Sequence, residues 1–342
     1  MNPQEPIRIA VVGTNFISDW FVHACGAVAG VRVAAVFSRK RETGNAFADR
    51  HGIGEIFTDF SALLRAQEID ALYIASPIAC HAEQSIAALR AGKHVLCEKM
   101  IGATASEFFA MKNAADQSGK VLLEAMRPAF DPALAAIRGQ LPRLGKIRCA
   151  ALSFCQYSSR YDAFLAGEVM NAFDPSLKNS ALADIGIYPL FLCVALFGEP
   201  TDVAAAQVTL SNGFAGAGTA LLSYPDMTAT IRYSKIHDDI LPSTIEGENG
   251  ALLIDKISAP SRLEFCAKGG GKEEISLPPA PSLPSFTAPN GKIGAKHMAS
   301  SHANMVYEIA AFRDAVRGKI DPAPYLATTA AVMRTVDRIQ NA

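Results

Sequence analysis

The chain has 342 residues, a length that corresponds to about two domains at roughly 150 residues each. Half of its residues are apolar and 19% are charged, a composition that excludes a disordered or low-complexity chain. Its 32 basic and 33 acidic residues leave a formal net charge of −1, so neither nucleic acid nor an anionic membrane surface is an expected partner. We therefore expect a globular protein that acts on a small molecule.

The amino terminus and the cysteines indicate the compartment. Residues 1–6 lack the basic and apolar regions of a signal peptide, and no apolar stretch reaches the roughly 18 residues of a membrane-spanning helix. The seven cysteines form no Cys-x-x-Cys pair, so we interpret them as buried thiols rather than as a zinc site or a disulfide framework. The sequence thus predicts a cytoplasmic protein with no metal site.

The first part of the chain alternates short apolar runs with amphipathic stretches. The runs that predict strands are 7–12, 31–37, a short one near 56, 71–75, 94–98 and 121–124. The stretches between them predict helices, including one over 80–91 and one that opens with a capping box at 104–107. Continuous apolar runs are typical of a parallel sheet covered on both faces. Residues 1–125 are therefore predicted to form a doubly wound, Rossmann-type dinucleotide-binding domain.

Residues 126–342 show a different pattern. Short strand-like runs follow one another from residue 149 to residue 265, which predicts a large, mostly antiparallel sheet. Residues 267–300 hold three consecutive glycines and several prolines without periodicity, so we expect a long loop there. Helical patterns return at 305–316 and 325–339. This half is predicted to be an α+β substrate-binding domain, and a sheet face without helices would suit a homodimer interface.

The first predicted strand ends in a turn that keeps one glycine of the dinucleotide-binding fingerprint. It reads Gly13-Thr14-Asn15-Phe16-Ile17. Such a turn presents backbone amides at a helix N-terminus to a pyrophosphate. Because asparagine tolerates the left-handed conformation, we expect Asn15 to replace the second glycine of the fingerprint. An ordinary α/β turn is the alternative.

The second predicted strand ends in Ser38 and Arg39, followed by Lys40 and Arg41. An NAD-specific site usually carries an acidic residue there, which binds the ribose 2′-hydroxyl. A hydroxyl and up to three cations suit the 2′-phosphate of NADP instead, although a solvated basic loop would have the same composition. The sequence therefore favours NADP and leaves NAD open.

Two further segments place polar residues where chemistry could occur. Glu98 and Lys99 directly follow a buried strand, so Lys99 is expected at the cofactor crevice or, as the alternative, extended from the strand end into solvent. Asp184 and Tyr188 are four residues apart, a spacing that places them on one face of a helix. Gly186 between them permits the close approach of a ligand or of backbone.

Together, these motifs resemble the glucose–fructose oxidoreductase and inositol dehydrogenase (Gfo/Idh/MocA) family. Further matching segments are residues 70–77, His81 and residues 91–99. Tyrosine at the end of the Asp-x-Gly motif, with the segments 156–162 and 171–175, resembles most closely the branch of dimeric dihydrodiol dehydrogenases. The resemblance covers most of residues 7–200 and, more loosely, 305–317.

The resemblance implies hydride transfer between a nicotinamide and a carbinol carbon of a sugar, cyclic polyol or dihydrodiol. It implies that Tyr188 is the acid/base at the substrate oxygen. A phenol ordinarily ionises near about pH 10, so Lys99 is expected to stabilise the tyrosinate. Asp184 would hold the substrate hydroxyl or orient Lys99, and Arg160 and Asn171 are further candidate substrate contacts.

The same resemblance implies a set of cofactor contacts at the strand ends. The candidates are Gly13, Thr14, Asn15, Phe16, Ile17, Ser38, Arg39, Ser76, Pro77, His81, Glu98 and Lys99. Among these, His81 opens a helix beside the crevice and is expected to contact the nicotinamide or its ribose.

Two positions depart from the family pattern. The usual Glu-Lys-Pro is Glu98-Lys99-Met100, and the glycine pair before the Asp motif is Asn179-Ser180. A non-catalytic dinucleotide- or sugar-sensing regulator on the same scaffold is therefore the alternative function. Met100 favours this alternative, whereas the intact catalytic motifs oppose it.

Overall fold

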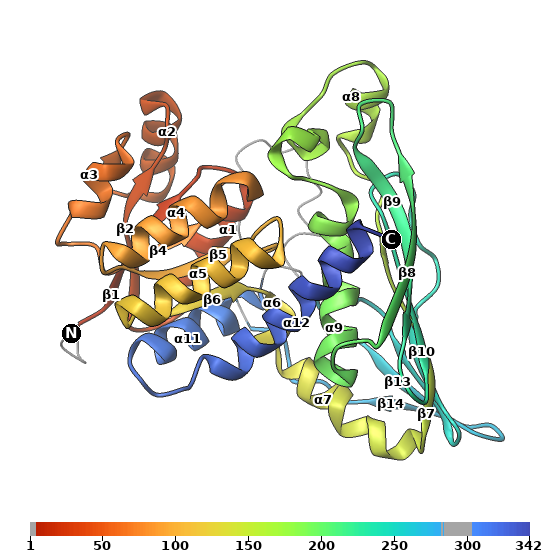
Figure 1. Cartoon of the computed structure of the whole chain (residues 1–342). Helices are drawn as coiled ribbons and strands as arrows, with labels where there is room; N and C mark the ends of the chain where they lie inside the picture. Colours follow the sequence, from red (N-terminus) through yellow and green to blue (C-terminus); the bar gives the residue numbers. More distant parts are fainter. Residues whose placement is uncertain (1–4, 282, 284–302) are drawn as a thin grey trace. The chain divides into compact units, whose positions relative to one another are not determined.

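The computed structural model describes residues 5–281, 283 and 303–342 (Figure 1). By its internal contacts the chain divides into two compact units. The first comprises Met1–Gly102, Ser106–Arg127 and Ala280–Leu326; the second comprises Ala103–Ala105, Pro128–Pro279 and Ala327–Ala342. Because the chain crosses between the units more than once, the linear limits 1–125 and 126–342 stay a prediction.

The first unit is built on a six-stranded sheet with the order β3-β2-β1-β4-β5-β6, and every neighbouring pair is parallel. Its strands are β1 (Ile7–Val12), β2 (Val31–Phe37), β3 (Glu55–Phe57), β4 (Ala71–Ile74), β5 (His94–Glu98) and β6 (Leu122–Ala125). The strand order reverses between β1 and β4, and the carboxyl ends at such a switch point form a ligand-binding crevice. The predicted doubly wound sheet is confirmed.

Helices pack against this sheet because its central strands are apolar on both sides. They are α1 (Phe16–Cys25), α2 (Arg41–His51), α3 (Phe60–Arg65), α4 (Ile78–Arg90), α5 (Ala105–Ser118), α6 (Arg127–Phe130) and α11 (Met305–Val316). The last of these, α11, comes from the far end of the chain and packs against α1. A sequence-distant helix therefore completes the first unit.

The second unit is built on an eight-stranded sheet with the order β14-β13-β12-β11-β7-β10-β9-β8. Its strands are β7 (Ile147–Cys155), β8 (Asp202–Thr209), β9 (Ala215–Ser223), β10 (Thr228–Ser234), β11 (Ser243–Gly247), β12 (Gly250–Ile254), β13 (Leu263–Ala267) and β14 (Lys272–Ile275). All neighbours are antiparallel except β7 and β10, which are parallel. The predicted mostly antiparallel sheet is confirmed.

Helical segments accompany this sheet. They are α7 (Pro132–Gln140), α8 (Tyr161–Leu165), α9 (Ile187–Phe197) and α12 (Ala323–Gln340), with 3-10 turns at Leu141–Leu144, Asn171–Phe173 and Pro175–Leu177 and a π-helical turn at Leu182–Gly186. Of these, α9 packs against β7 and β10. No helix in the described ranges is both long and apolar enough to cross a membrane.

The expectation of an unbroken loop over residues 267–300 is wrong at its beginning. Strands β13 and β14 form a hairpin there, and Gly269, Gly270 and Gly271 all adopt positive φ in its turn. Three glycines make this turn sterically accessible, whereas the sequence pattern alone was compatible with an open loop. Residues 282 and 284–302 of the expected loop lie outside the described residues.

Candidate active site

Gly13 forms the turn between β1 and α1 in the first unit. Its φ of 110° is rarely accessible to other residues, and a Cβ at this position would lie 2.8 Å from the carbonyl oxygen of Ala75. The Gly13 amide donates to the Phe37 carbonyl at 3.1 Å. The turn is therefore held tightly at the carboxyl ends of β1, β2 and β4, where only glycine fits.

Asn15 differs from its predicted conformation. Its backbone is extended, with φ −85° and ψ 178°, and its side-chain oxygen accepts from the amides of Ile17 at 3.1 Å and Ser18 at 3.3 Å. Its side-chain nitrogen donates to the Ala75 carbonyl at 2.8 Å. Asn15 is therefore the N-cap of α1 rather than a left-handed replacement for glycine, because capping requires an extended backbone.

The end of β2 carries the predicted basic cluster. The Ser38 and Thr43 hydroxyls are 2.6 Å apart, and the Lys40 amide donates to the Ser38 hydroxyl at 3.4 Å. Arg39, Lys40 and Arg41 are exposed, and α2 begins at Arg41 without a side-chain cap. A hydroxyl, three cations and the start of a helix thus occur together, an arrangement suited to a phosphate.

His81 braces two backbone segments beside the crevice. Its Nδ1 lies 2.9 Å from the Met100 carbonyl oxygen, and its Nε2 lies 2.8 Å from the Ser76 carbonyl oxygen. Burial lowers the pKa of His81, so the neutral ring donates to one of these two carbonyls. The Ser76 hydroxyl donates to Oε1 of Gln84 at 2.6 Å. The cofactor contact expected of His81 stays a prediction.

Glu98 and Lys99 lie at the end of β5. Oε1 of Glu98 accepts from the Tyr73 hydroxyl at 2.5 Å, and Oε2 accepts from the Lys99 amide at 3.2 Å. Burial raises the pKa of Glu98, and the Lys99 charge opposes that shift. The Lys99–Met100 peptide bond is cis, and the Met100 side chain is fully buried.

Behind this strand end lies a buried polar cluster. Arg127 donates from Nη1 to Oδ1 of Asn304 at 3.1 Å. Glu308 on α11 is fully buried, and neither of its carboxylate oxygens has a hydrogen-bond partner in the part of the chain that the structure describes. Burial raises the pKa of Glu308 well above its usual range, the charge of Glu98 adds to this shift, and Arg127 opposes it.

In the second unit, Asp184 lies in the π-helical turn that precedes α9, and Tyr188 lies in the first turn of α9. Because one π-helical turn takes an extra residue, the regular i, i+4 geometry expected for this pair does not apply. Oδ2 of Asp184 is 2.8 Å from Nζ of Lys235. Tyr188 is buried, and its ring lies 5.7 Å from that of Phe154.

Gly186 allows a close approach, as its position in the motif predicts. A Cβ there would lie 2.6 Å from Cγ of Tyr233 on β10. The missing side chain therefore admits an aromatic ring of the same unit, and this contact seats the start of α9 on the sheet.

The two further substrate candidates, Arg160 and Asn171, also lie in the second unit. Arg160 immediately precedes α8, and its amide donates to the Ser158 hydroxyl at 3.3 Å. Asn171 opens a 3-10 turn and is exposed, and its carbonyl accepts from the side chain of Asn179 at 3.3 Å.

Two family models match successive parts of the chain. Residues 7–126 match "Oxidoreductase family, NAD-binding Rossmann fold", and residues 142–253 match "GFO/IDH/MocA C-terminal domain". The scyllo-inositol 2-dehydrogenase (NADP(+)) IolU of Bacillus subtilis (strain 168) is 41% identical, with 81% of this chain and 85% of IolU covered.

The chain belongs to the Gfo/Idh/MocA family of oxidoreductases. A trans-1,2-dihydrobenzene-1,2-diol dehydrogenase of Macaca fuscata fuscata is 28% identical, with 94% of this chain and 91% of the relative covered. The crystal structure of KijD10, a 3-ketoreductase from Actinomadura kijaniata in complex with NADP and TDP-benzene, shares the fold. It has a TM-score of 0.82 and 24% identity, with 98% of each chain covered. The resemblance read from the motifs is confirmed, and this Gfo/Idh/MocA protein is an NAD(P)-dependent oxidoreductase.

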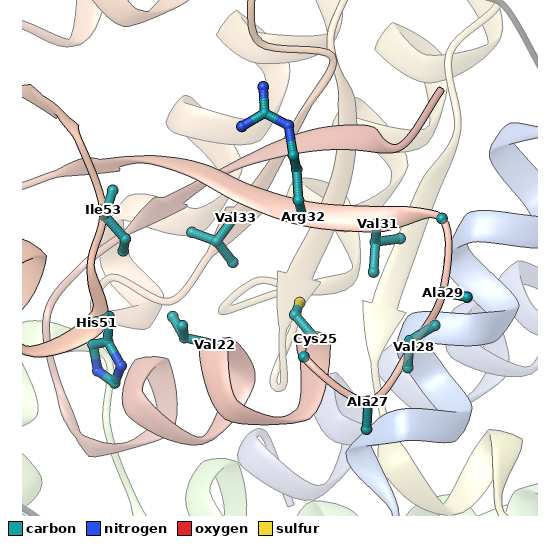
Figure 2. Close-up of a pocket in the computed structure, with 12 residues that line it drawn as sticks. Val22, Cys25, Ala27, Val28, Ala29, Val31, Arg32, Val33, His51 and Ile53 are labelled. Carbon is teal, nitrogen blue, oxygen red and sulfur yellow. The ribbon is translucent and has the colours of Figure 1, made fainter. Parts of the chain in front are cut away.

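The first unit of this Gfo/Idh/MocA protein fits a dinucleotide. A Cβ at residue 13 would collide with the strand end, and the turn from Gly13 to Ile17 remains partly accessible although the flanking strands are buried. Figure 2 shows a different pocket, of about 530 Å³, between the end of α1 and the start of β2. It lies at the amino end of β2, away from the carboxyl ends where the crevice forms.

Sequence reasoning missed four residues around the candidate sites: Tyr73, Arg127, Lys235 and Glu308. Only Glu308 had a local signal, because it shares the buried face of α11 with Met305, Ile309 and Phe312. An acidic residue on an otherwise apolar helix face indicates a buried polar site. The other three depend on contacts between segments that are distant in sequence.

Proposed function

We propose that this protein is an NADP-dependent dehydrogenase that oxidises a secondary hydroxyl of a cyclic polyol or sugar and catalyses the reverse reduction. The observation that carries the proposal is the 41% identity to an NADP(+)-dependent scyllo-inositol 2-dehydrogenase over 81% of the chain. The motif residues Lys99, Asp184 and Tyr188 are all present.

The cofactor is proposed to lie along the carboxyl ends of the parallel strands. Residues 13–17 would bind the pyrophosphate, and Ser76, Pro77, His81, Glu98 and Lys99 would line the nicotinamide side. The exposed Arg39 and the Ser38 hydroxyl support a 2′-phosphate and therefore NADP over NAD. When bound, the nicotinamide would accept or supply the hydride.

Side chains of this protein would carry out the proton transfer that accompanies hydride transfer. Tyr188 would take the proton from the substrate hydroxyl during oxidation and return it during reduction. Lys99 would stabilise the tyrosinate by its positive charge. Asp184, partly exposed beside a buried cation, would accept a hydrogen bond from the substrate. Arg160 and Asn171 would complete the substrate contacts.

The test replaces each proposed proton-handling group. Lys99→Met and Tyr188→Phe are expected to lower turnover of NADP⁺ with scyllo-inositol and related polyols by about 10²- to 10⁴-fold. Cofactor affinity, measured by fluorescence titration, should persist in Tyr188→Phe. Unchanged turnover in both variants would remove the proposed roles, and no hydride exchange by the wild type over a polyol panel would favour the sensing regulator.

The oligomer and the compartment are further proposals. Val208 and Leu221 are 53% and 43% exposed, and the pairing of Leu221 with Ala204 places both on one face of the sheet. This exposed apolar face supports a homodimer, and a monomer in sedimentation velocity at micromolar concentration would contradict it. Seven free thiols support a reducing, cytoplasmic compartment.

A further inference from the structure

Lys235 is a buried cation that immediately follows β10 in the second unit. Its side chain is only 4% exposed, and its ammonium donates to the Ala172 carbonyl at 2.6 Å. The same nitrogen lies 2.8 Å from Oδ2 of Asp184. It also lies 4.9 Å and 5.3 Å from the ring centres of Phe173 and Phe214.

The environment of Lys235 selects a compact positive charge. A buried ammonium loses its hydration, and this cost is offset only by hydrogen bonds, a counter-charge or aromatic faces. Asp184 supplies the counter-charge, and the rings of Phe173 and Phe214 close the apolar sides. A neutral residue of similar length would leave the Asp184 carboxylate without this cation.

The two partners of the pair differ in accessibility. The Asp184 side chain is 37% exposed, against 4% for Lys235. A ligand in solution can therefore reach the carboxylate but not the ammonium. Lys235 acts on a ligand only through the groups that it holds.

Lys235 also joins two segments that carry proposed substrate contacts. Its bond to the Ala172 carbonyl holds the 3-10 turn that begins at Asn171, while its ion pair holds the π-helical turn of Asp184. Its backbone is anchored as well, because the Lys235 amide donates to the Gly216 carbonyl at 2.9 Å. One buried side chain thus sets the spacing between Asp184 and Asn171.

We propose that Lys235 is a positioning residue that holds the Asp184 carboxylate in register with the 171–173 turn, so that it determines which polyol hydroxyl is bound. This inference rests on the proposed function, in which Asp184 accepts a hydrogen bond from the substrate. Lys235 itself touches neither the substrate nor the cofactor in this scheme.

The first measurement uses Lys235→Met in the full-length protein with NADP⁺ and scyllo-inositol. We expect KM for the polyol to rise by about 10- to 100-fold, the loss typical of a charged hydrogen bond, with a smaller change in kcat. Lys235→Arg, which keeps the charge, should recover part of this loss. Affinity for NADP⁺ should stay within about twofold, because NADP⁺ binding is assigned to the first unit.

Lys146→Met is the matched control. Lys146 also lies 2.8 Å from a carboxylate, that of Asp226, but both side chains are about half exposed. An exposed ion pair contributes little, so this variant should keep the wild-type KM. Polyol binding measured by calorimetry in the presence of NADP⁺ provides a readout that does not require turnover.

A double-mutant cycle with Asp184→Asn separates positioning from general structural damage. If Lys235 acts through Asp184, Lys235→Met should change polyol affinity by less than about threefold in the Asp184→Asn background. Equal losses in both backgrounds would overturn the inference, as would an unchanged KM in Lys235→Met. If Lys235→Met does not fold, the cycle is run with Lys235→Arg under the same criterion.

Failure of the proposed function gives a different result. An Asp184→Asn variant with wild-type KM and kcat would show that Asp184 does not bind substrate. A rise in KM confined to the Lys235 variants could then not act through Asp184. The inference about Lys235 falls alone when Asp184→Asn is impaired and either the cycle is additive or Lys235→Met keeps the wild-type KM.

Discussion

The buried Tyr73 hydroxyl donates a hydrogen bond of 2.5 Å to Oε1 of Glu98 and so joins side chains of the neighbouring strands β4 and β5. The Tyr73 ring stacks on Phe21 with centroids 3.6 Å apart, so the hydroxyl has little freedom to turn away. The other oxygen of Glu98 accepts from the Lys99 amide. Tyr73, which is itself fully buried, therefore helps to hold the backbone of the proposed catalytic lysine.

Tyr73→Phe should weaken both folding and turnover. The change leaves a buried carboxylate oxygen unpaired, which costs about 1–3 kcal/mol of the free energy of unfolding. Urea denaturation measures this loss, and steady-state kinetics should show a lower kcat because Lys99 is less firmly held.

Tyr224→Phe is the control for this prediction. The Tyr224 hydroxyl donates to the Gly198 carbonyl at 3.1 Å, at the carboxyl end of α9, whereas Tyr188 lies in the first turn of that helix. Its removal should lower stability and leave kcat unchanged. Equal effects of the two variants on kcat would contradict a link between Tyr73 and Lys99.

Glu308→Gln should stabilise the protein increasingly as the pH rises. Burial raises the folded-state pKa of Glu308 well above the value of about 4.3 in an unfolded chain. Above about pH 4.3 the unfolded chain releases this proton while the folded protein keeps it, so the wild type loses stability with rising pH. Glutamine does not ionise, so this loss of stability with rising pH is absent from the Glu308→Gln variant.

Urea unfolding of wild type and Glu308→Gln at pH 5 and pH 8 measures this difference. The gap in the free energy of unfolding should widen by up to about 1.4 kcal/mol per pH unit below the folded-state pKa. The raised pKa of Glu98 acts in the same direction in both proteins, so it adds to the pH dependence of each. A gap that is constant with pH would refute a protonated Glu308.

Gly186→Ala should destabilise the second unit by about 1–3 kcal/mol, because its Cβ would lie 2.6–3.0 Å from atoms of the Tyr233 side chain. The displaced helix start should also lower activity. Gly139→Ala in α7 is the matched control, since nothing lies within 4 Å of its added Cβ and alanine favours a helix. Equal melting temperatures for Gly186→Ala and wild type would be incompatible with this close contact.

Arg39→Ala should reduce affinity for NADP⁺ by about 10- to 100-fold and leave affinity for NAD⁺ nearly unchanged, because only NADP⁺ carries the 2′-phosphate. Fluorescence titration with both cofactors gives the ratio. Arg32→Ala removes an exposed cation near the amino end of the same strand and should leave both affinities unchanged. A parallel fall for both cofactors in Arg39→Ala would exclude phosphate recognition by this residue.

Much of the fold follows from local patterns in the sequence. Continuous apolar runs predicted the parallel strands, and dense β-rich runs predicted the second sheet, since burial on one or both faces determines which residues a strand can carry. The motifs around Gly13, Glu98 and Asp184 predicted the family. Local chemistry was misread at Asn15, because the same residue type suits both a left-handed turn and an N-cap.

The sequence by itself thus determined the two sheets, the family and the candidate catalytic groups. Only the tertiary structure decided which side chains support those groups: Tyr73 on Glu98, Lys235 on Asp184, and Tyr233 in the space left by Gly186. Backbone preference and periodicity act over a few residues, so they can be read along the chain. Burial and ion pairing join segments that meet only when the chain folds, and these contacts control the charge and position of each functional group.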